Sequence, residues 1–256
     1  MKRKALLLGV AMALAGPCAI AQAAQPANGS GVQAGAIDQE AIQALKTMGA
    51  YLLSLQRFQV STELSGERVL ADGQKLQHTA AARLDVSRPN KIKASISSAR
   101  SEREILYDGK VVTIYAPSQK YYSSIAMVDT LGGLIQQLEN RYGIELPLAD
   151  LFAWGTSNAP TGTIDSAMNA GQDIVDGDVC EHYAFRQGKI DWQIWIAAGS
   201  RPLPRKLVIT DRSDEARPQS VSTIRWTTSP RFSDSVFTFA APKGARQIEA
   251  VPLTNQ

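Results

Sequence analysis

The sequence predicts an α+β protein in which one strongly curved antiparallel sheet carries helices on one of its faces. Two observations lead to this fold class. Apolar residues recur first at helical spacing, then with period two, then at helical spacing again, and finally with period two. Gly, Asp and Asn residues separate the period-two segments at short intervals, as in a meander of antiparallel strands, and the sequence has no internal repeat.

The first 23 residues have the pattern of a secretory signal peptide. Residues 2–4 are basic, residues 5–15 are small and apolar, and residues 21–23 read Ala-Gln-Ala, which suits signal peptidase. We expect cleavage after Ala23 and export to the periplasm. A membrane anchor is the weaker alternative, because the apolar run is too short to span a bilayer. A lipid-modified cysteine at Cys18 is disfavoured by the proline that precedes it.

The charge balance argues against nucleic acid as a partner. The chain has 27 basic and 24 acidic residues, but three of the basic ones lie in residues 2–4, so the exported chain carries 24 of each. Cleavage also removes Cys18 and leaves Cys180 as the one cysteine, so no internal disulfide is expected and stability must come from a packed core. We expect no transmembrane segment in the exported chain.

Residues 24–36 are rich in Ala, Gly, Gln and Asn and predict a disordered leader before a single domain over residues 37–249. Asp38 is expected to cap a helix that runs to about Gln56, with Glu40 favoured in its first turn. The helix carries an apolar stripe at three- and four-residue steps, formed by Ile42, Leu45, Met48, Leu52 and Leu55. Such a stripe usually packs into a core, and a membrane-binding helix is the alternative.

Alternating apolar residues predict the strands of a first meander. Asp72-Gly73 and Asp108-Gly109 supply turns, and the second of these is the strongest short hairpin signal in the chain. The predicted strands cover residues 58–64, 76–86, 92–96, 105–107, 111–115 and 121–125.

A helical insert follows the first meander. Residues 131–142 have helical spacing, and Gly143 suits the C-terminal cap. A second short helix is expected, with Pro147 in its first turn. Residues 157–162 are expected to form a loop. The apolar residues of the two helices are Leu131, Leu134, Ile135, Leu138 and Tyr142 in the first, and Leu148, Leu151, Phe152 and Trp154 in the second.

A second meander is predicted after the insert. Turns at Asp176-Gly177 and Gly188-Lys189 separate three strands within residues 176–210, and further strands are expected at residues 174–175, 221–226 and 236–239. The middle of the three strands is apolar on both faces and is therefore expected in the interior of the sheet. One face carries Trp192, Ile194 and Ile196, and the other carries Gln193, Trp195 and Ala197.

The sequence contains no pattern that argues for catalysis, and we expect a protein that is not an enzyme and has no cofactor and no metal. No nucleophile elbow, zinc-protease helix or phosphate-binding loop is present. Cys180 and His182 share one face of a strand, and His78 would have to meet them to complete a metal site. A buried thiol beside a hydrogen-bonded histidine is the favoured interpretation, since zinc usually takes four ligands at recognisable spacings.

Four segments resemble a family of predicted periplasmic proteins of unknown function: residues 107–110, 142–151, 191–196 and 202–210. The resemblance covers about Asp38 to Gln247. The chain also resembles, more distantly, the outer-membrane lipoprotein carriers of the Lol type. That resemblance implies an unclosed half-barrel of about eleven strands, with the N-terminal helix and the helical insert packed on its concave face.

Such a shape implies a periplasmic binding or carrier protein for a lipid, a lipoprotein acyl chain or another hydrophobic ligand. The alternative to a ligand site is a dry core, in which the same residues pack against one another without a ligand. Two other functions stay open: a module that docks on or senses an envelope protein, and a hydrolase built around His78 or His182. The sequence does not tell which face of each strand points inward. The candidate lining residues are Leu84, Ile96, Leu106, Ile114, Tyr122, Leu134, Leu138, Phe152, Trp192 and Ile194.

Overall fold

The computed structural model describes residues 35–253, which belong to one compact unit covering residues 33–256. The predicted signal peptide, residues 1–23, lies outside the described residues, and so does the predicted leader up to residue 34. None of the described helices is both long enough and apolar enough to cross a membrane.

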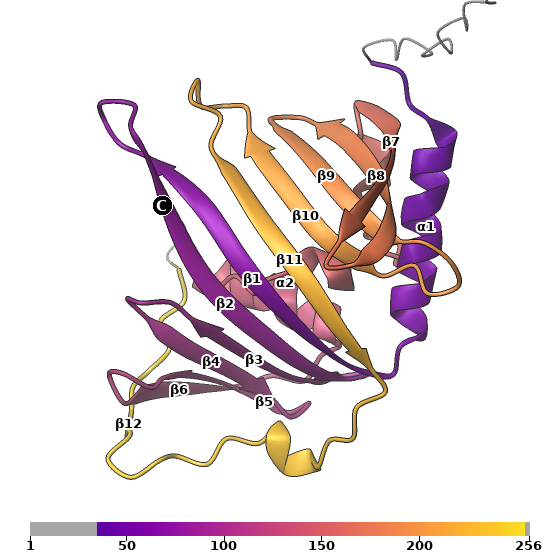
Figure 1. Cartoon of the computed structure of the whole chain (residues 1–256). Coiled ribbons are helices and arrows are strands. Elements are labelled where there is room, and N and C mark those ends of the chain that lie inside the picture. The colour runs from indigo at the N-terminus through magenta and orange to yellow at the C-terminus, as the bar shows by residue number, and fades with distance from the viewer. Residues whose placement is uncertain (1–34, 254–256) are drawn as a thin grey trace, which may run out of the picture. The chain divides into compact units, whose positions relative to one another are not determined.

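The described residues form one sheet of twelve strands with two α-helices, and the sheet does not close on itself (Figure 1). The strand order is β12-β6-β5-β4-β3-β2-β1-β11-β10-β9-β8-β7. Two meanders thus lie side by side and join where β1 pairs with β11. The strands are β1 (Arg57–Val69), β2 (Lys75–Ser87), β3 (Lys91–Ser97), β4 (Glu102–Tyr107), β5 (Val111–Ala116), β6 (Tyr121–Ala126), β7 (Ser166–Val175), β8 (Asp178–Gln187), β9 (Ile190–Ala197), β10 (Pro204–Asp211), β11 (Gln219–Thr228) and β12 (Arg246–Gln247).

The predicted fold class, a curved and unclosed sheet with helices on one face, is confirmed. The strand number is twelve rather than about eleven, and the sheet is not wholly antiparallel, because the short β12 runs parallel to β6. The expected strand at residues 236–239 is wrong. Asp234–Val236 form a single 3₁₀ turn there. The Phe239 ring packs against the Tyr122 ring, with the two ring centroids 4.9 Å apart.

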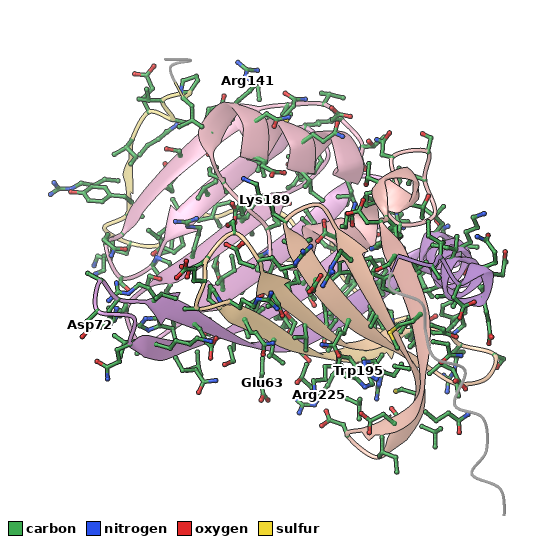
Figure 2. The ribbon with its side chains drawn as sticks, turned by 90° about the horizontal axis from the view of Figure 1, so that it is seen from above. Glu63, Asp72, Arg141, Lys189, Trp195 and Arg225 are labelled. Carbon is green, nitrogen blue, oxygen red and sulfur yellow. The ribbon has the colours of Figure 1, made fainter. Side chains whose placement is uncertain are left out.

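Strand register defines the two faces of the sheet, because residues directly opposite each other in an antiparallel pair share a face. Val60 lies opposite Leu84, and Leu207 lies opposite Ile194. Both pairs belong to the face that the helices cover, which we call the inner face. Glu63, Trp195 and Arg225 project from the other side, the outer face, where the Arg225 guanidinium donates to Glu63 at 2.8 Å (Figure 2).

Helix α1 (Gln39–Ser54) begins as the sequence predicts, since the Asp38 carboxylate accepts a hydrogen bond from the Glu40 amide at 2.9 Å. The helix runs along β7 at one edge of the sheet (Figure 1). Its apolar stripe packs into the protein core, and the membrane-binding alternative is not supported. The buried residues of the stripe are Ala41, Leu45, Met48 and Leu52, while the predicted Ile42 and Leu55 are only half-buried.

Helix α2 (Leu131–Tyr142) fills the inner face over the first meander. Thr130 caps its start by accepting from the Gly133 amide, and Gly143 ends it with a φ of 62°, a conformation that favours glycine. The residues that α2 buries against β1 to β5 are Leu131, Leu134, Ile135 and Leu138. We call this packed region the α2 cluster.

The segment after α2 differs from the prediction. Pro147 does not begin an α-helix, and a 3₁₀ helix of four residues forms instead at Ala149–Phe152, after Leu148 has adopted a positive φ of 57°. A second short 3₁₀ helix, Pro160–Thr163, lies partly within the predicted loop. Phe152 packs into the α2 cluster, whereas Leu151 and Trp154 pack against α1 and β9.

Strand β9 lies between β8 and β10 and is buried on both faces, as predicted. On the inner face Trp192, Ile194 and Ile196 pack with α1. On the outer face Trp195 packs in a small separate cluster with Val175, Cys180 and Val208.

Candidate functional site

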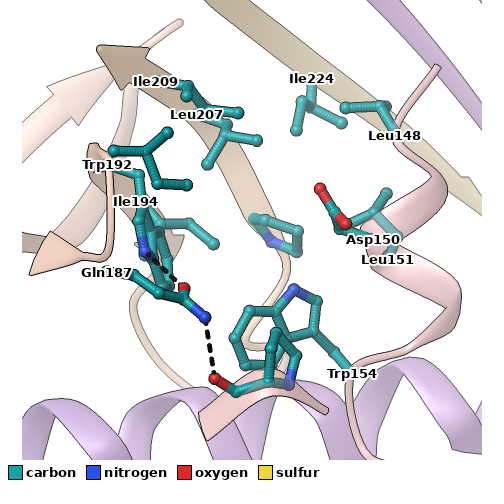
Figure 3. A pocket seen from close by; sticks show the side chains of 13 residues that line it. Leu148, Asp150, Leu151, Trp154, Gln187, Trp192, Ile194, Leu207, Ile209 and Ile224 are labelled. Atoms are coloured by element: carbon teal, nitrogen blue, oxygen red, sulfur yellow. Dashed lines mark hydrogen bonds between the residues drawn. The ribbon is translucent and has the colours of Figure 1, made fainter. Parts of the chain in front are cut away.

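A cavity of about 340 Å³ opens on the inner face of the second meander. Strands β9, β10 and β11 form one wall, and the segment of the two 3₁₀ helices forms the other (Figure 3). The lining side chains are Leu148, Asp150, Leu151, Trp154, Pro160, Gln187, Ile190, Trp192, Ile194, Pro204, Leu207, Ile209 and Ile224. All but Asp150 and Gln187 are apolar, so the cavity suits a hydrophobic ligand.

The strand wall follows from the period-two alternation of β9 and β10. Ile194 lies opposite Leu207, and Trp192 lies opposite Ile209, so the four side chains point to the inner face together. Figure 3 shows all four directed into the cavity. The intervening residues of these strands point to the outer face.

The second wall, residues 148–160, is held against α1 by two glycines. A methyl group added at Gly49 would lie only 2.5 Å from the backbone nitrogen of Gly155. Gly155 also has a φ of 82°, which favours glycine. This backbone-to-backbone approach brings Trp154 over the cavity, where its ring lies 5.8 Å from that of Trp192.

Gln187 ties the two walls together through its side-chain amide. Its oxygen accepts from the Trp192 indole at 3.2 Å, and its nitrogen donates to the Pro160 carbonyl at 3.2 Å (Figure 3). The same nitrogen donates to the Thr163 hydroxyl at 2.5 Å. Because these bonds use both N–H groups of the amide, Gln187 acts as a strut between the β8–β9 hairpin and residues 160–163.

Of the lining residues that the structure describes, only Asp150 is ionisable. Its carboxylate points into the cavity, and no hydrogen bond joins it to another residue drawn in Figure 3. The residue as a whole is exposed to solvent. Desolvation by the surrounding protein nevertheless raises the pKa of its carboxyl group, because apolar surroundings disfavour the charged form.

The ten residues proposed from the sequence fall into three groups. Trp192 and Ile194 line the cavity. Six others belong to the α2 cluster or pack against it, on the side of the sheet where α2 fills the space: Leu84, Ile96, Ile114, Leu134, Leu138 and Phe152.

The last two residues, Leu106 and Tyr122, lie on the outer face, which corrects their expected inward orientation. Leu106 pairs with Thr113, one residue out of phase with the inward-facing Ile105, and Tyr122 is covered by Phe239. Period two predicts that a strand has two faces, but it does not predict which face the helices cover.

Apart from Trp192 and Ile194, the residues that line the cavity were not predicted from the sequence. The alternation of Leu207 and Ile209 was a usable signal, because register with β9 places them beside Trp192 and Ile194. Asp150 and Pro160 carried no such signal, since their positions depend on the irregular path of residues 148–163.

Cys180 and His182 lie on the outer face, away from the cavity. The His182 ring stacks on Trp195 with centroids 4.0 Å apart, and its Nε2 lies 3.0 Å from the Gln193 amide oxygen. His78 lies on the inner face, opposite Gly66, so the sheet separates the two histidines. Within residues 35–253, no group of three or more His, Cys, Asp and Glu side chains is arranged to hold a metal ion.

The Cys180 thiol is expected to be unreactive in the native protein. Its side chain is fully buried, and this burial raises the pKa of the thiol and so suppresses the nucleophilic thiolate. In protein lacking residues 1–23, reaction with a disulfide reagent such as DTNB should be at least about tenfold slower than after unfolding in urea. Equal rates in the native and unfolded protein would contradict a buried thiol.

Comparison with solved structures found several of similar fold. One is LprF from Mycobacterium bovis, at 14% identity and a TM-score of 0.47, with 83% of this chain and 100% of that chain covered. An uncharacterized conserved protein from Thermus thermophilus matches at 12% identity and a TM-score of 0.46, with 82% and 98% covered. A LolA superfamily protein from Nitrosomonas europaea matches at 12% identity and a TM-score of 0.36, with 78% and 97% covered.

Comparison with the curated proteins found no match. A protein family described as "Predicted periplasmic protein (DUF2092)" matches residues 41–251, which include every strand of the sheet and nearly all of α1. The chain therefore belongs to the DUF2092 family of predicted periplasmic proteins.

Proposed function

We propose that this protein is a periplasmic, non-enzymatic binding or carrier protein for a lipid, a lipoprotein acyl chain or another hydrophobic ligand. The observation that carries the proposal is the apolar cavity of about 340 Å³ on the inner face. Its volume falls within the range of about 300–1,000 Å³ that is typical of small-molecule sites. An apolar cavity with a polar group at its mouth suits an amphiphile better than a fully polar ligand.

The free energy of burying an apolar chain in this cavity is consistent with reversible binding. Each methylene removed from water contributes about 0.8 kcal/mol, so a ten-carbon chain gains up to about 8 kcal/mol before the cost of association. The proposed contact residues are Trp154, Trp192, Ile194, Leu207 and Ile209. Under α2 the inner face is filled at Leu131, Leu134 and Leu138, which are almost completely buried.

A periplasmic location is supported by the family description and by the predicted signal peptide. A non-enzymatic role is supported by the lining of the cavity, in which Asp150 is the single ionisable side chain and has no acid, base or nucleophile beside it among the lining residues.

The docking alternative has one observation in its favour. The hairpin of β7 and β8 exposes two large apolar residues near its turn, Ile174 and Val179, which are 68% and 49% accessible. Exposed apolar groups at a sheet edge suit contact with another protein. The cavity favours the carrier function over this alternative, since a docking module does not need one.

Native mass spectrometry of the protein purified from periplasm without detergent, followed by lipid extraction, tests the proposal. A stoichiometric adduct that extracts as a lipid or an acylated peptide is the expected result. An unliganded mass that stays unchanged after incubation with phospholipid and lipopeptide would contradict a carrier and favour the docking module.

Filling the cavity should abolish binding without unfolding the protein. Ile209→Trp adds a bulky ring at the strand wall, and we expect the affinity for a fluorescent hydrophobic probe to fall by at least about tenfold. Overpacking costs about 1–3 kcal/mol, so circular dichroism should verify the fold. Ile174→Trp, at an exposed position outside the cavity, is the matched control and should bind like the wild type.

A further inference from the structure

The Asp150 carboxylate makes no hydrogen bond or ion pair with the part of the chain that the structure describes, although the residue lines the cavity and is exposed to solvent. It stands among leucine, isoleucine and tryptophan side chains, and its carboxylate points into the cavity (Figure 3). Desolvation by the cavity wall raises the pKa of its carboxyl group, and no hydrogen bond or cation within residues 35–253 opposes this shift. A carboxylate without a protein partner is free to bind a ligand group at the mouth of the cavity.

The other polar groups of the lining do not compete for that role. Gln187 uses both N–H groups of its amide on Pro160 and Thr163. Among the described residues, no lysine, arginine or histidine lines the cavity. A ligand head that lies near Asp150 would therefore meet a hydrogen-bond acceptor with negative character and no positive charge from the wall.

We propose that the cavity selects amphiphiles whose single apolar chain ends in a hydrogen-bond-donating head, an amine or a hydroxyl, which Asp150 binds. This inference rests on the proposed function and deepens it by naming the ligand class. The chain lies against Trp192, Ile194 and Leu207, and the head donates to the Asp150 carboxylate. Fatty acids and other amphiphiles with an anionic head are disfavoured, because like charges at short range repel where water is partly excluded.

Four ten-carbon ligands separate the contribution of the head from that of the chain: decylamine, 1-decanol, methyl decanoate and decanoate. Trp154 and Trp192 lie in the cavity wall, so intrinsic fluorescence reports binding at pH 8, with every ligand below its micelle concentration. We expect decylamine and 1-decanol to bind at least about tenfold more tightly than decanoate, as suits a hydrogen bond to a charged group. Methyl decanoate, which is neutral but has no donor, should lie between them.

Asp150→Asn tests whether Asp150 sets this order, since it keeps the size of the side chain and an acceptor oxygen but removes the charge. In this variant the affinity for decanoate should rise to within about threefold of that for 1-decanol. Glu139→Gln is the matched control, because it removes one exposed carboxylate on α2, which contributes no residue to the lining. It should keep the wild-type order of affinities.

Two results would overturn the inference and leave the proposed function standing: equal affinity of the wild type for decylamine and decanoate, or the wild-type order of affinities in the Asp150→Asn variant. In either case the cavity would bind the chain without selecting the head. Failure of all four ligands to bind the wild type is a different outcome, which would contradict the proposed function and the inference with it.

Discussion

Leu138→Ala is expected to lower the free energy of unfolding by about 2–5 kcal/mol, the range for truncating a leucine in a packed core. Leu138 is fully buried in the α2 cluster, so its removal leaves a void that surrounding side chains fill only in part. Leu207→Ala is the matched control, because the same atoms are removed from a half-buried side chain that borders the cavity. Its cost should be below about 2 kcal/mol, since fewer contacts are lost.

Urea denaturation followed by circular dichroism measures both free energies of unfolding, with the dependence on urea checked for equality between the variants. The two variants should also differ in function. Leu207→Ala enlarges the cavity and should change the affinity for ten-carbon ligands, whereas Leu138→Ala should leave that affinity nearly unchanged. Equal destabilisation by the two substitutions would contradict the division of the inner face into a filled half and a hollow half.

This division explains why six of the ten residues proposed from the sequence do not line the cavity. Leu134 and Leu138 were identified as apolar residues of a helix over the sheet, and that placement is confirmed. The helical pattern of residues 131–142 predicts a buried stripe, but it contains no information on whether the space beneath is filled or open. That depends on how closely α2 approaches β1 to β5, which is a tertiary property.

The regular elements were predictable because each depends on local chemistry. The Asp38 cap, the Gly143 terminus and the turns at Asp108-Gly109 and Asp176-Gly177 need only neighbouring residues, and all four are confirmed. The face of a strand is a different kind of property. Leu106 and Ile105 differ by one position, and only the path of the helices decides which of them is inward.

The irregular segments were not predictable for a related reason. Leu148 adopts a positive φ, which is uncommon for leucine, and this lets the chain turn into the 3₁₀ helix that carries Asp150. Phe239 was expected in a strand, but its ring covers Tyr122 on the outer face instead. In both places, contacts between distant segments outweigh the local conformational preference of the residues. The pattern of residues in one sequence therefore does not predict these conformations.

Gly49→Ala is expected to destabilise the protein by about 1–3 kcal/mol, although alanine is the better helix former by about 1 kcal/mol. The added methyl group would meet backbone atoms of Gly155 at 2.5 Å and 2.8 Å, which cannot turn aside as a side chain can. Helix α1 and residues 148–160 must therefore separate. Gly132→Ala is the matched control, since this helical glycine of α2 has open space around it and should gain up to about 1 kcal/mol.

The same separation should affect ligand binding, because Gly155 adjoins Trp154, which closes one side of the cavity against Trp192. We expect Gly49→Ala to weaken binding of ten-carbon ligands and to shift the tryptophan emission to longer wavelength, while Gly132→Ala leaves both unchanged. Wild-type affinity in a destabilised Gly49→Ala variant would mean that the 148–160 wall adapts its position freely. Loss of affinity would mean that the close approach of two glycines, far apart in the sequence, holds one wall of the binding site in place.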